Sequence, residues 1–142
     1  MTPVPVTAID TSVAVPLLMT SHRHHTVVAE WAESRTLALC GHALLETYSV
    51  LTRLPGDARV AAADAVELID ANFNASLQLG VRASRSAHRE FARRGIAGGA
   101  TYDALVALTA REHGVALATR DARARSTYDA FGIVTEVLAG DS

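Results

Sequence analysis

Two short apolar runs, each followed closely by an aspartate, restrict the fold of this chain more than any other feature. Residues 6–9 lead directly into Asp10, and residues 115–119 are followed, after one arginine, by Asp121. Aliphatic and β-branched residues are typical of buried strands, so both runs predict strands with an acid just past the carboxyl end. In an open parallel α/β sheet, ligands bind in the crevice outside these strand ends. The two aspartates are therefore the first candidates for a functional site.

Helical and strand-like patterns alternate along the rest of the chain. Apolar residues recur at helical spacing in residues 12–19, 27–32, 43–53, 57–73 and 100–113, and a charged, exposed helix is expected over residues 84–94. Further strands are expected over residues 36–40, 76–81 and 133–138. We expect Ser12 and Asp57 to cap their helices, Val66 to lie on a buried face, and Gly114 to end the helix before it. This alternation predicts one domain over residues 1–142, an α/β fold built as a three-layer α/β/α sandwich with a mainly parallel sheet.

Composition excludes several classes of protein. Apolar residues make up 49% of the chain, which excludes a disordered protein, yet no segment approaches the roughly 20 apolar residues of a membrane helix. No basic residue precedes Arg23, so the start does not resemble a signal peptide. Cys40 is the single cysteine, which excludes an internal disulfide and a cysteine-based metal motif. We therefore expect a cytoplasmic protein with no membrane partner.

The overall charge gives no sign of nucleic-acid binding, because the formal net charge is −2. All 13 basic residues are arginines, whose planar guanidinium groups suit carboxylates and phosphates. Three local groups are candidate basic patches: Arg82, Arg85 and Arg89; Arg93 and Arg94; and Arg120, Arg123 and Arg125. Most such groups are solvated helix faces, so they do not by themselves identify a partner.

Two further acids fall where the predicted fold brings them to the edge that carries Asp10 and Asp121. Glu46 and Asp103 each lie in the first turns of a predicted helix, and helices that follow parallel strands begin at the carboxyl edge. Either acid alone is explained as a group that complements a helix dipole. Four carboxylates at one cleft repel each other unless a cation lies among them, and oxygen ligands without His or Cys favour Mg²⁺ or Mn²⁺. Such ions activate water for attack on a phosphate and stabilise the leaving oxygen.

The residues around the four acids resemble those of a known family. The segments are IDTSVAV with Asp10, ALLETYSVLTRL with Glu46, GGATYDALVALTA with Asp103, and ATRDARA with Asp121. Together they resemble the four-acid pattern of PIN-domain ribonucleases and, more narrowly, of the VapC toxins of bacterial toxin–antitoxin pairs. The resemblance runs from Asp10 to about Leu138, almost the whole chain.

The resemblance implies a Mg²⁺- or Mn²⁺-dependent endoribonuclease that cleaves structured RNA, typically tRNA or rRNA. It further implies that the four acids bind the metal, that a VapB-type antitoxin holds the enzyme inactive, and that the protein forms a homodimer. The chain departs from many relatives at Ala100, where they carry a serine that caps the following helix. We expect Thr101 or the backbone of Gly98 and Gly99 to take over this cap.

Hydroxyl and guanidinium groups close to the acids are candidates for supporting roles. The hydroxyls that could support the ligands or contact phosphate are those of Thr11, Ser12 and Thr119. The candidate RNA contacts are Arg53, Arg120 and Arg123. Arg53 follows Glu46 by seven residues, so it either pairs with that carboxylate or reaches an RNA phosphate, and the sequence leaves both readings open.

Two other functions are also open at this stage: a catalytically silent module that binds RNA or protein, and another Mg²⁺-dependent phosphotransfer enzyme such as a phosphatase. Ser12 stands where a phosphoaspartate-forming phosphatase would carry a second aspartate, and no GxxxxGK or GxGxxG motif occurs. His22, His24 and His25 lie in a polar connection without an acid or cysteine at ligand spacing, so we do not expect a metal site there. Trp31 is expected in the core, or alternatively in a groove for an antitoxin helix.

Overall fold

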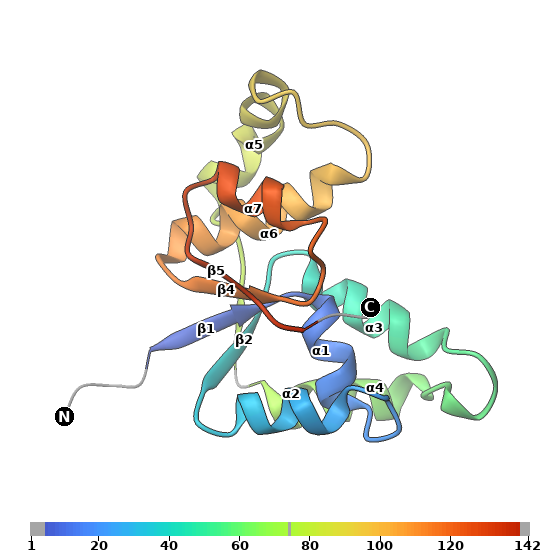
Figure 1. Ribbon diagram of the computed structural model, residues 1–142. Helices are drawn as coiled ribbons and strands as arrows, with labels where there is room; N and C mark the ends of the chain where they lie inside the picture. Colours follow the sequence, from blue (N-terminus) through green and yellow to red (C-terminus); the bar gives the residue numbers. More distant parts are fainter. Residues whose placement is uncertain (1–4, 74, 140–142) are drawn as a thin grey trace.

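The computed structural model describes residues 5–73 and 75–139 (Figure 1). A five-stranded sheet lies at the centre, in the order β3-β2-β1-β4-β5, and each neighbouring pair is parallel. The strands are β1 (Val6–Ile9), β2 (Thr36–Cys40), β3 (Ser76–Leu77), β4 (Ala116–Thr119) and β5 (Thr135–Val137). Across the described ranges, none of the helices combines the length and apolar character needed to span a bilayer.

Helices cover both faces of the sheet, which confirms the predicted three-layer architecture. One layer contains α1 (Thr11–Leu18), α2 (His25–Ala32), α3 (Ala43–Thr52) and α4 (Ala62–Asn72). The other contains α5 (Val81–Arg93), α6 (Ala100–His113) and α7 (Arg125–Ala130).

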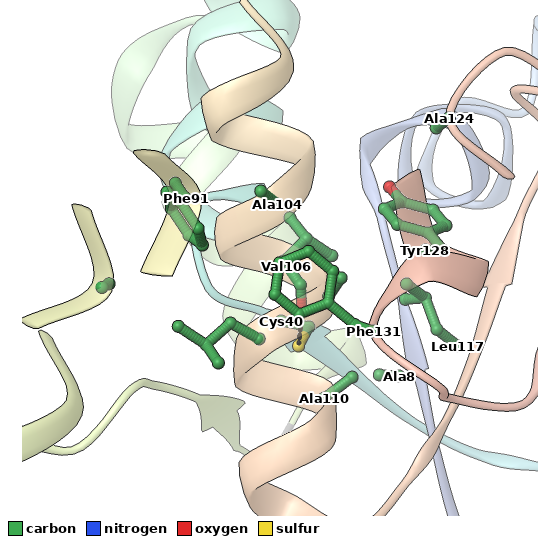
Figure 2. Close-up of a cluster of buried hydrophobic side chains, with 13 residues drawn as sticks. Ala8, Cys40, Phe91, Ala104, Val106, Ala110, Leu117, Ala124, Tyr128 and Phe131 are labelled. Atoms are coloured by element: carbon green, nitrogen blue, oxygen red, sulfur yellow. Dashed lines mark hydrogen bonds between the residues drawn. The ribbon is translucent and has the colours of Figure 1, made fainter. Parts of the chain in front are cut away.

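The two layers follow from the alternation of side chains along each strand. Ala8 and Leu117 pack under α5–α7, in the cluster that includes Phe131 (Figure 2). The next residue of each strand, Ile9 or Ala118, packs under α1–α4.

The sheet has a topological switch point between β1 and β4. From β1 the chain builds β2 and β3 on one side, and then crosses to build β4 and β5 on the other. The loops that follow two such strands diverge and leave a crevice at the carboxyl edge. Asp10 follows β1 directly and Asp121 lies two residues beyond β4, so these two acids flank the crevice.

Several local predictions were wrong, each for a physical reason. Asp10, not Ser12, caps α1, because the Asp10 carboxylate accepts the Ser12 backbone N–H. Asp57 lies in a short 3₁₀ turn (Gly56–Ala58), and α4 begins at Ala62 without a side-chain cap. With this start, the buried face of α4 carries Ala65, and Val66 is 48% exposed.

The chain between β3 and α6 also differs from expectation. The strand expected over residues 76–81 contains only Ser76 and Leu77, residues 78–80 form a connection, and α5 begins at Val81. The predicted bounds of α6 are confirmed, and Gly114 ends it in the left-handed conformation (φ +64°) that glycine adopts without steric cost.

Candidate active site

Asp10 is held in place by three hydroxyl groups from three different elements. It is 7% exposed, and Ser12 donates a hydrogen bond to its Oδ1. Its Oδ2 accepts hydrogen bonds from Thr119 at the end of β4 and, at 2.8 Å, from the Tyr128 hydroxyl of α7. Because both carboxylate oxygens are engaged, the orientation of Asp10 at the switch point is fixed by the fold.

These contacts have opposing effects on the protonation of Asp10. Burial raises the pKa of Asp10, because the charged form loses hydration, whereas the hydrogen bonds from Ser12, Thr119 and Tyr128 lower it and partly offset the effect of burial. Burial and the nearby charge of Asp10 also raise the pKa of Tyr128, so its hydroxyl stays protonated and acts as a donor.

Sequence reasoning missed Tyr128. It lies 118 residues from Asp10, and no spacing rule connects the two. The available signal was general: a buried tyrosine needs a partner for its hydroxyl, and a buried carboxylate needs donors.

Of the predicted supporting hydroxyls, Ser12 and Thr119 contact Asp10 and Thr11 does not. The Ser12 hydroxyl also accepts the Arg120 backbone N–H at 2.7 Å, and Thr119 accepts the Asp121 backbone N–H at 3.0 Å. The first bond joins the loop after β4 to the start of α1, and the second fixes the turn between Thr119 and Asp121. The Thr11 hydroxyl is buried and has no hydrogen-bond partner among the described residues.

A close approach of backbones brings the start of α3 against α6. Gly41, between β2 and α3, has a φ of +58°. A Cβ atom there would lie 3.0 Å from the Thr109 hydroxyl and 3.4 Å from the Leu105 carbonyl oxygen, both of α6. Glycine is therefore required both for the backbone conformation and for the space.

Next to this contact, His42 of the turn before α3 stacks on Tyr102 of α6, close to Glu46 and Asp103. The His42 ring stacks on Tyr102, with 4.5 Å between ring centroids and 27° between planes. His42 Nε2 lies 3.7 Å from a carboxylate oxygen of Glu46, and Asp103 follows Tyr102 in the chain. The stacked pair thus connects the turn that carries Glu46 with the turn that carries Asp103.

The electrostatics of Asp103 show that the four acids lie near one another. Burial raises its pKa most, followed by the negative charges of Asp121, Asp10 and Glu46. Among residues 5–73 and 75–139, however, no three His, Cys, Asp or Glu side chains are grouped tightly enough to hold an ion together. The structure therefore brings the predicted acids to one edge of the sheet, within electrostatic reach, but not into one compact cluster.

The predicted arginine contacts occupy different environments. Arg123 is 94% exposed at its side chain, 3.3 Å from Asp121. Arg120 is turned back onto the protein, where its guanidinium donates to the carbonyl oxygens of Ala139 and Ser12. Both arginines line a hollow of about 620 Å³ beside the switch point, together with Ser12, Asp121, Ala122, Val137 and Leu138.

Arg53 lies just past the end of α3 and is exposed. No ion pair joins it to Glu46 within the ranges that the structure describes, where the partner of Glu46 is His42. The pairing that the sequence left open is thus not observed, and a contact with RNA stays a prediction.

Other residues singled out in the sequence have structural contacts. His25 Nδ1 lies 2.9 Å from the Pro16 carbonyl oxygen. The Trp31 indole N–H donates to Glu136 at 2.9 Å, which ties α2 to β5. No side chain caps α6, whose first turn follows Gly99. Cys40 is buried, and burial raises the pKa of its thiol to about 12.

The sequence matches the PIN domain family over residues 7–130. Ribonuclease VapC27 of Mycobacterium tuberculosis (strain H37Rv) is 53% identical over 135 residues, which cover 95% of this chain and 98% of the relative. Ribonuclease VapC40 of the same species is 41% identical over 130 residues, covering 91% and 96%. This chain is a PIN-domain ribonuclease of the VapC family. The resemblance seen in the sequence is confirmed, and with it the assignment to the toxins of VapBC toxin–antitoxin systems.

Solved structures of low sequence identity share the fold of this VapC chain. VapBC2 from Rickettsia felis, solved with a DNA fragment of its promoter, superposes with a TM-score of 0.63 at 13% identity, covering 94% of this chain and 98% of that one. FitAcB from Neisseria gonorrhoeae superposes with a TM-score of 0.62 at 19% identity, covering 92% of this chain and 96% of that chain. M. tuberculosis VapC20, a sarcin–ricin loop cleaving toxin, superposes with a TM-score of 0.62 at 18% identity, covering 84% of this chain and 93% of that chain.

Proposed function

We propose that this VapC ribonuclease is a Mg²⁺- or Mn²⁺-dependent endonuclease that hydrolyses structured RNA, namely tRNA or rRNA. We assign the metal to Asp10, Glu46, Asp103 and Asp121. The observation that carries this proposal is the position of the four acids at one edge of the sheet, after β1 and β4 and in the first turns of α3 and α6. In keeping with this position, burial and then the charges of Asp121, Asp10 and Glu46 raise the pKa of Asp103. A negative potential shared by four carboxylates attracts a divalent cation, and their hard oxygen atoms suit Mg²⁺ or Mn²⁺.

When bound, the ion supplies activation of water and neutralisation of the charge that develops on the phosphate. The residues of the chain orient the reactants. Asp10, immobilised by its three hydroxyl donors, presents a fixed carboxylate at the switch point. Arg123, exposed beside Asp121, is placed to meet an RNA phosphate, and its planar fork suits that contact. Hydrolysis leaves a 3′-hydroxyl and a 5′-phosphate.

The proposal includes two protein partners. A VapB-type antitoxin inhibits the enzyme, and a second copy of the chain forms a homodimer with it. Support comes from family membership at 53% identity and from the shared fold of the VapBC2 and FitAcB structures.

Incubation of purified protein with total cellular RNA tests the proposal, in parallel with Mg²⁺, with Mn²⁺ and with EDTA. We expect discrete cuts with either ion, no cut with EDTA, and 5′-phosphate ends when the fragments are sequenced. Cuts that persist in EDTA would contradict the metal assignment. RNA binding without cleavage would indicate a silent module, and hydrolysis of small phosphate esters in place of RNA would indicate another phosphotransfer enzyme.

A further inference from the structure

Four arginines form a continuous stripe along the outer face of α5, which we call the arginine stripe: Arg82, Arg85, Arg89 and Arg93. Their spacings of three, four and four residues place them within an arc of about 80° on a helix of 3.6 residues per turn. All four are exposed, whereas Ala87 and Phe91, on the other side of α5, are buried against the rest of its layer. Figure 1 shows α5 at the periphery of the molecule, beyond α6 and α7.

The four arginines of the stripe have no acidic partner among the described residues. In the described part of the chain no ion pair involves any of its four residues. Five arginines elsewhere do pair with carboxylates: Arg35, Arg94, Arg111, Arg123 and Arg125. The one acid of α5, Glu90, faces away from the stripe and binds Arg94 and Arg111. The stripe is therefore positive charge that the fold does not neutralise.

This arrangement works against the stability of the helix. Like charges three or four residues apart repel each other across successive turns, and the stripe contains three such neighbouring pairs. Among residues 5–73 and 75–139 these charges gain no compensating ion pair. A positive stripe on a chain of net charge −2 is instead complementary to an external polyanion.

The chemistry of the stripe favours nucleic acid over protein as its partner. Arginine is enriched in protein interfaces where it surrounds an apolar core of aromatic and methionine side chains, but the four arginines of the stripe follow one another along the outer face of α5 with no aromatic or methionine side chain among them. The stripe spans 12 residues, from Arg82 to Arg93, or about 16 Å of helix axis. This length is enough to contact more than one phosphate along an RNA backbone. The helix then leads, through residues 94–99, into α6, which carries Asp103 in its first turn.

We propose that the arginine stripe of α5 is a docking surface for the phosphate backbone of the substrate RNA, outside the acidic site. It holds a helical stem of a structured RNA while the scissile strand lies at the carboxyl edge of the sheet. This inference rests on the proposed ribonuclease function and adds to it a surface that selects structured over short unstructured RNA. Phosphate contacts of this kind position the RNA without reading its sequence.

The test measures binding of fluorescently labelled bulk tRNA, ribosomal RNA and a short unstructured oligoribonucleotide to the full chain in EDTA, over a range of salt concentrations. Replacing all four arginines with glutamine is expected to weaken tRNA or rRNA binding on the order of 100-fold, and to lower the slope of log K against log salt by about 3, because each lost phosphate contact removes about 0.7–0.9. Binding of the short oligonucleotide should change much less. Replacement with lysine retains the charge and should retain the slope.

A matched pair of double variants separates position from net charge. Arg85→Gln with Arg89→Gln removes two charges from the stripe, and Arg35→Gln with Arg59→Gln removes two from the opposite layer and its loops. We expect only the first pair to weaken binding of structured RNA. The stripe variant should also have a Tm at or above that of the unmodified chain, because repulsion along α5 is relieved. A purely structural role of these arginines predicts a lower Tm.

Equal binding by the two double variants, or an unchanged salt slope in the fourfold glutamine variant, would overturn the inference. These failures are distinguishable from failure of the proposed function. If the fourfold glutamine variant cleaves RNA as the unmodified chain does, the proposed ribonuclease function is supported and the docking surface is refuted. If the protein binds structured RNA through the stripe but cleaves no RNA with Mg²⁺ or Mn²⁺, the docking surface is supported and the proposed ribonuclease function is refuted.

Discussion

Removing a single oxygen atom, in Tyr128→Phe, tests how the fold holds Asp10. Tyr128 is 1% exposed and its ring packs in the cluster with Leu117 and Phe131 (Figure 2), so phenylalanine keeps the packing. The variant loses only the 2.8 Å hydrogen bond to Oδ2 of Asp10. A hydrogen bond to a charged group contributes about 1.5–3 kcal/mol, and we expect the free energy of unfolding to fall by that amount at neutral pH. In a chain of this size, each kcal/mol lowers Tm by about 2–4 °C.

The sign of the pH dependence follows from the pKa of Asp10. The Tyr128 bond lowers this pKa, so its loss raises the pKa further and penalises the ionised carboxylate. The destabilisation should therefore be largest at neutral pH, where Asp10 is ionised in the unfolded chain. It should shrink as the pH falls through the native pKa, because the protonated carboxyl no longer depends on the bond.

Urea unfolding in EDTA at neutral and mildly acidic pH measures this effect. Tyr48→Phe is the matched control, because no hydrogen bond of the Tyr48 hydroxyl occurs within the described ranges. We expect the control to change stability by less than about 0.5 kcal/mol. If Tyr128→Phe behaves like the control, or if its loss of stability grows toward acidic pH, the reasoning is refuted. Titration calorimetry should further show Mn²⁺ binding weakened about 10–100-fold, the usual effect of losing a group that orients a ligand.

Three further predictions concern other parts of the site. Gly41→Ala should lower the free energy of unfolding by about 1–3 kcal/mol, as measured in urea, and by more than Gly56→Ala, which shares the positive φ (+59°) but has nothing within 4 Å of the added Cβ. Cys40 should resist alkylation in the native protein and react on unfolding, as followed by mass spectrometry, because burial raises its pKa to about 12; rapid native labelling would disprove this. Asp103→Asn should unfold at a higher Tm than the unmodified chain in EDTA at neutral pH, and this advantage should vanish at acidic pH. Because the pKa of Asp103 is raised in the folded chain, the unmodified chain loses stability as the pH rises through that pKa, whereas asparagine does not titrate. An advantage of the variant that grew at acidic pH would contradict the raised pKa.

The strands that carry the site and the helix that carries Asp103 were predictable because their signals are local. β1, β2 and α6 have the expected bounds, set by short aliphatic runs and by the glycines on either side of α6. The caps were not predictable in the same way. Asp10 and Ser12 are both residue types that cap helices well, and they lie two residues apart. Asp10 is the cap in the structure, and its buried carboxylate is stabilised by each hydrogen-bond donor that contacts it.

The connections within the site depend on tertiary packing and could not be deduced from spacing. Tyr128 reaches Asp10 only because α7 packs on the layer above β4, and His42 reaches Tyr102 only because Gly41 lets the turn after β2 touch α6. The sequence predicted Arg120 as an RNA contact but gave no indication that its guanidinium donates to the carbonyl oxygens of Ser12 and Ala139.

The central claim, that the acids at the switch point form one metal-dependent catalytic site, is tested most directly through Asp103→Asn. Asp103 is the suitable position, because it makes no hydrogen bond to the three hydroxyls that hold Asp10. Mn²⁺ affinity and cleavage of total RNA are measured on the same preparation of the variant and of the unmodified chain, with circular dichroism to confirm folding. We predict a folded variant that binds Mn²⁺ at least about 10-fold more weakly and cleaves no RNA. A folded variant that cleaves RNA at the rate of the unmodified chain would contradict the account.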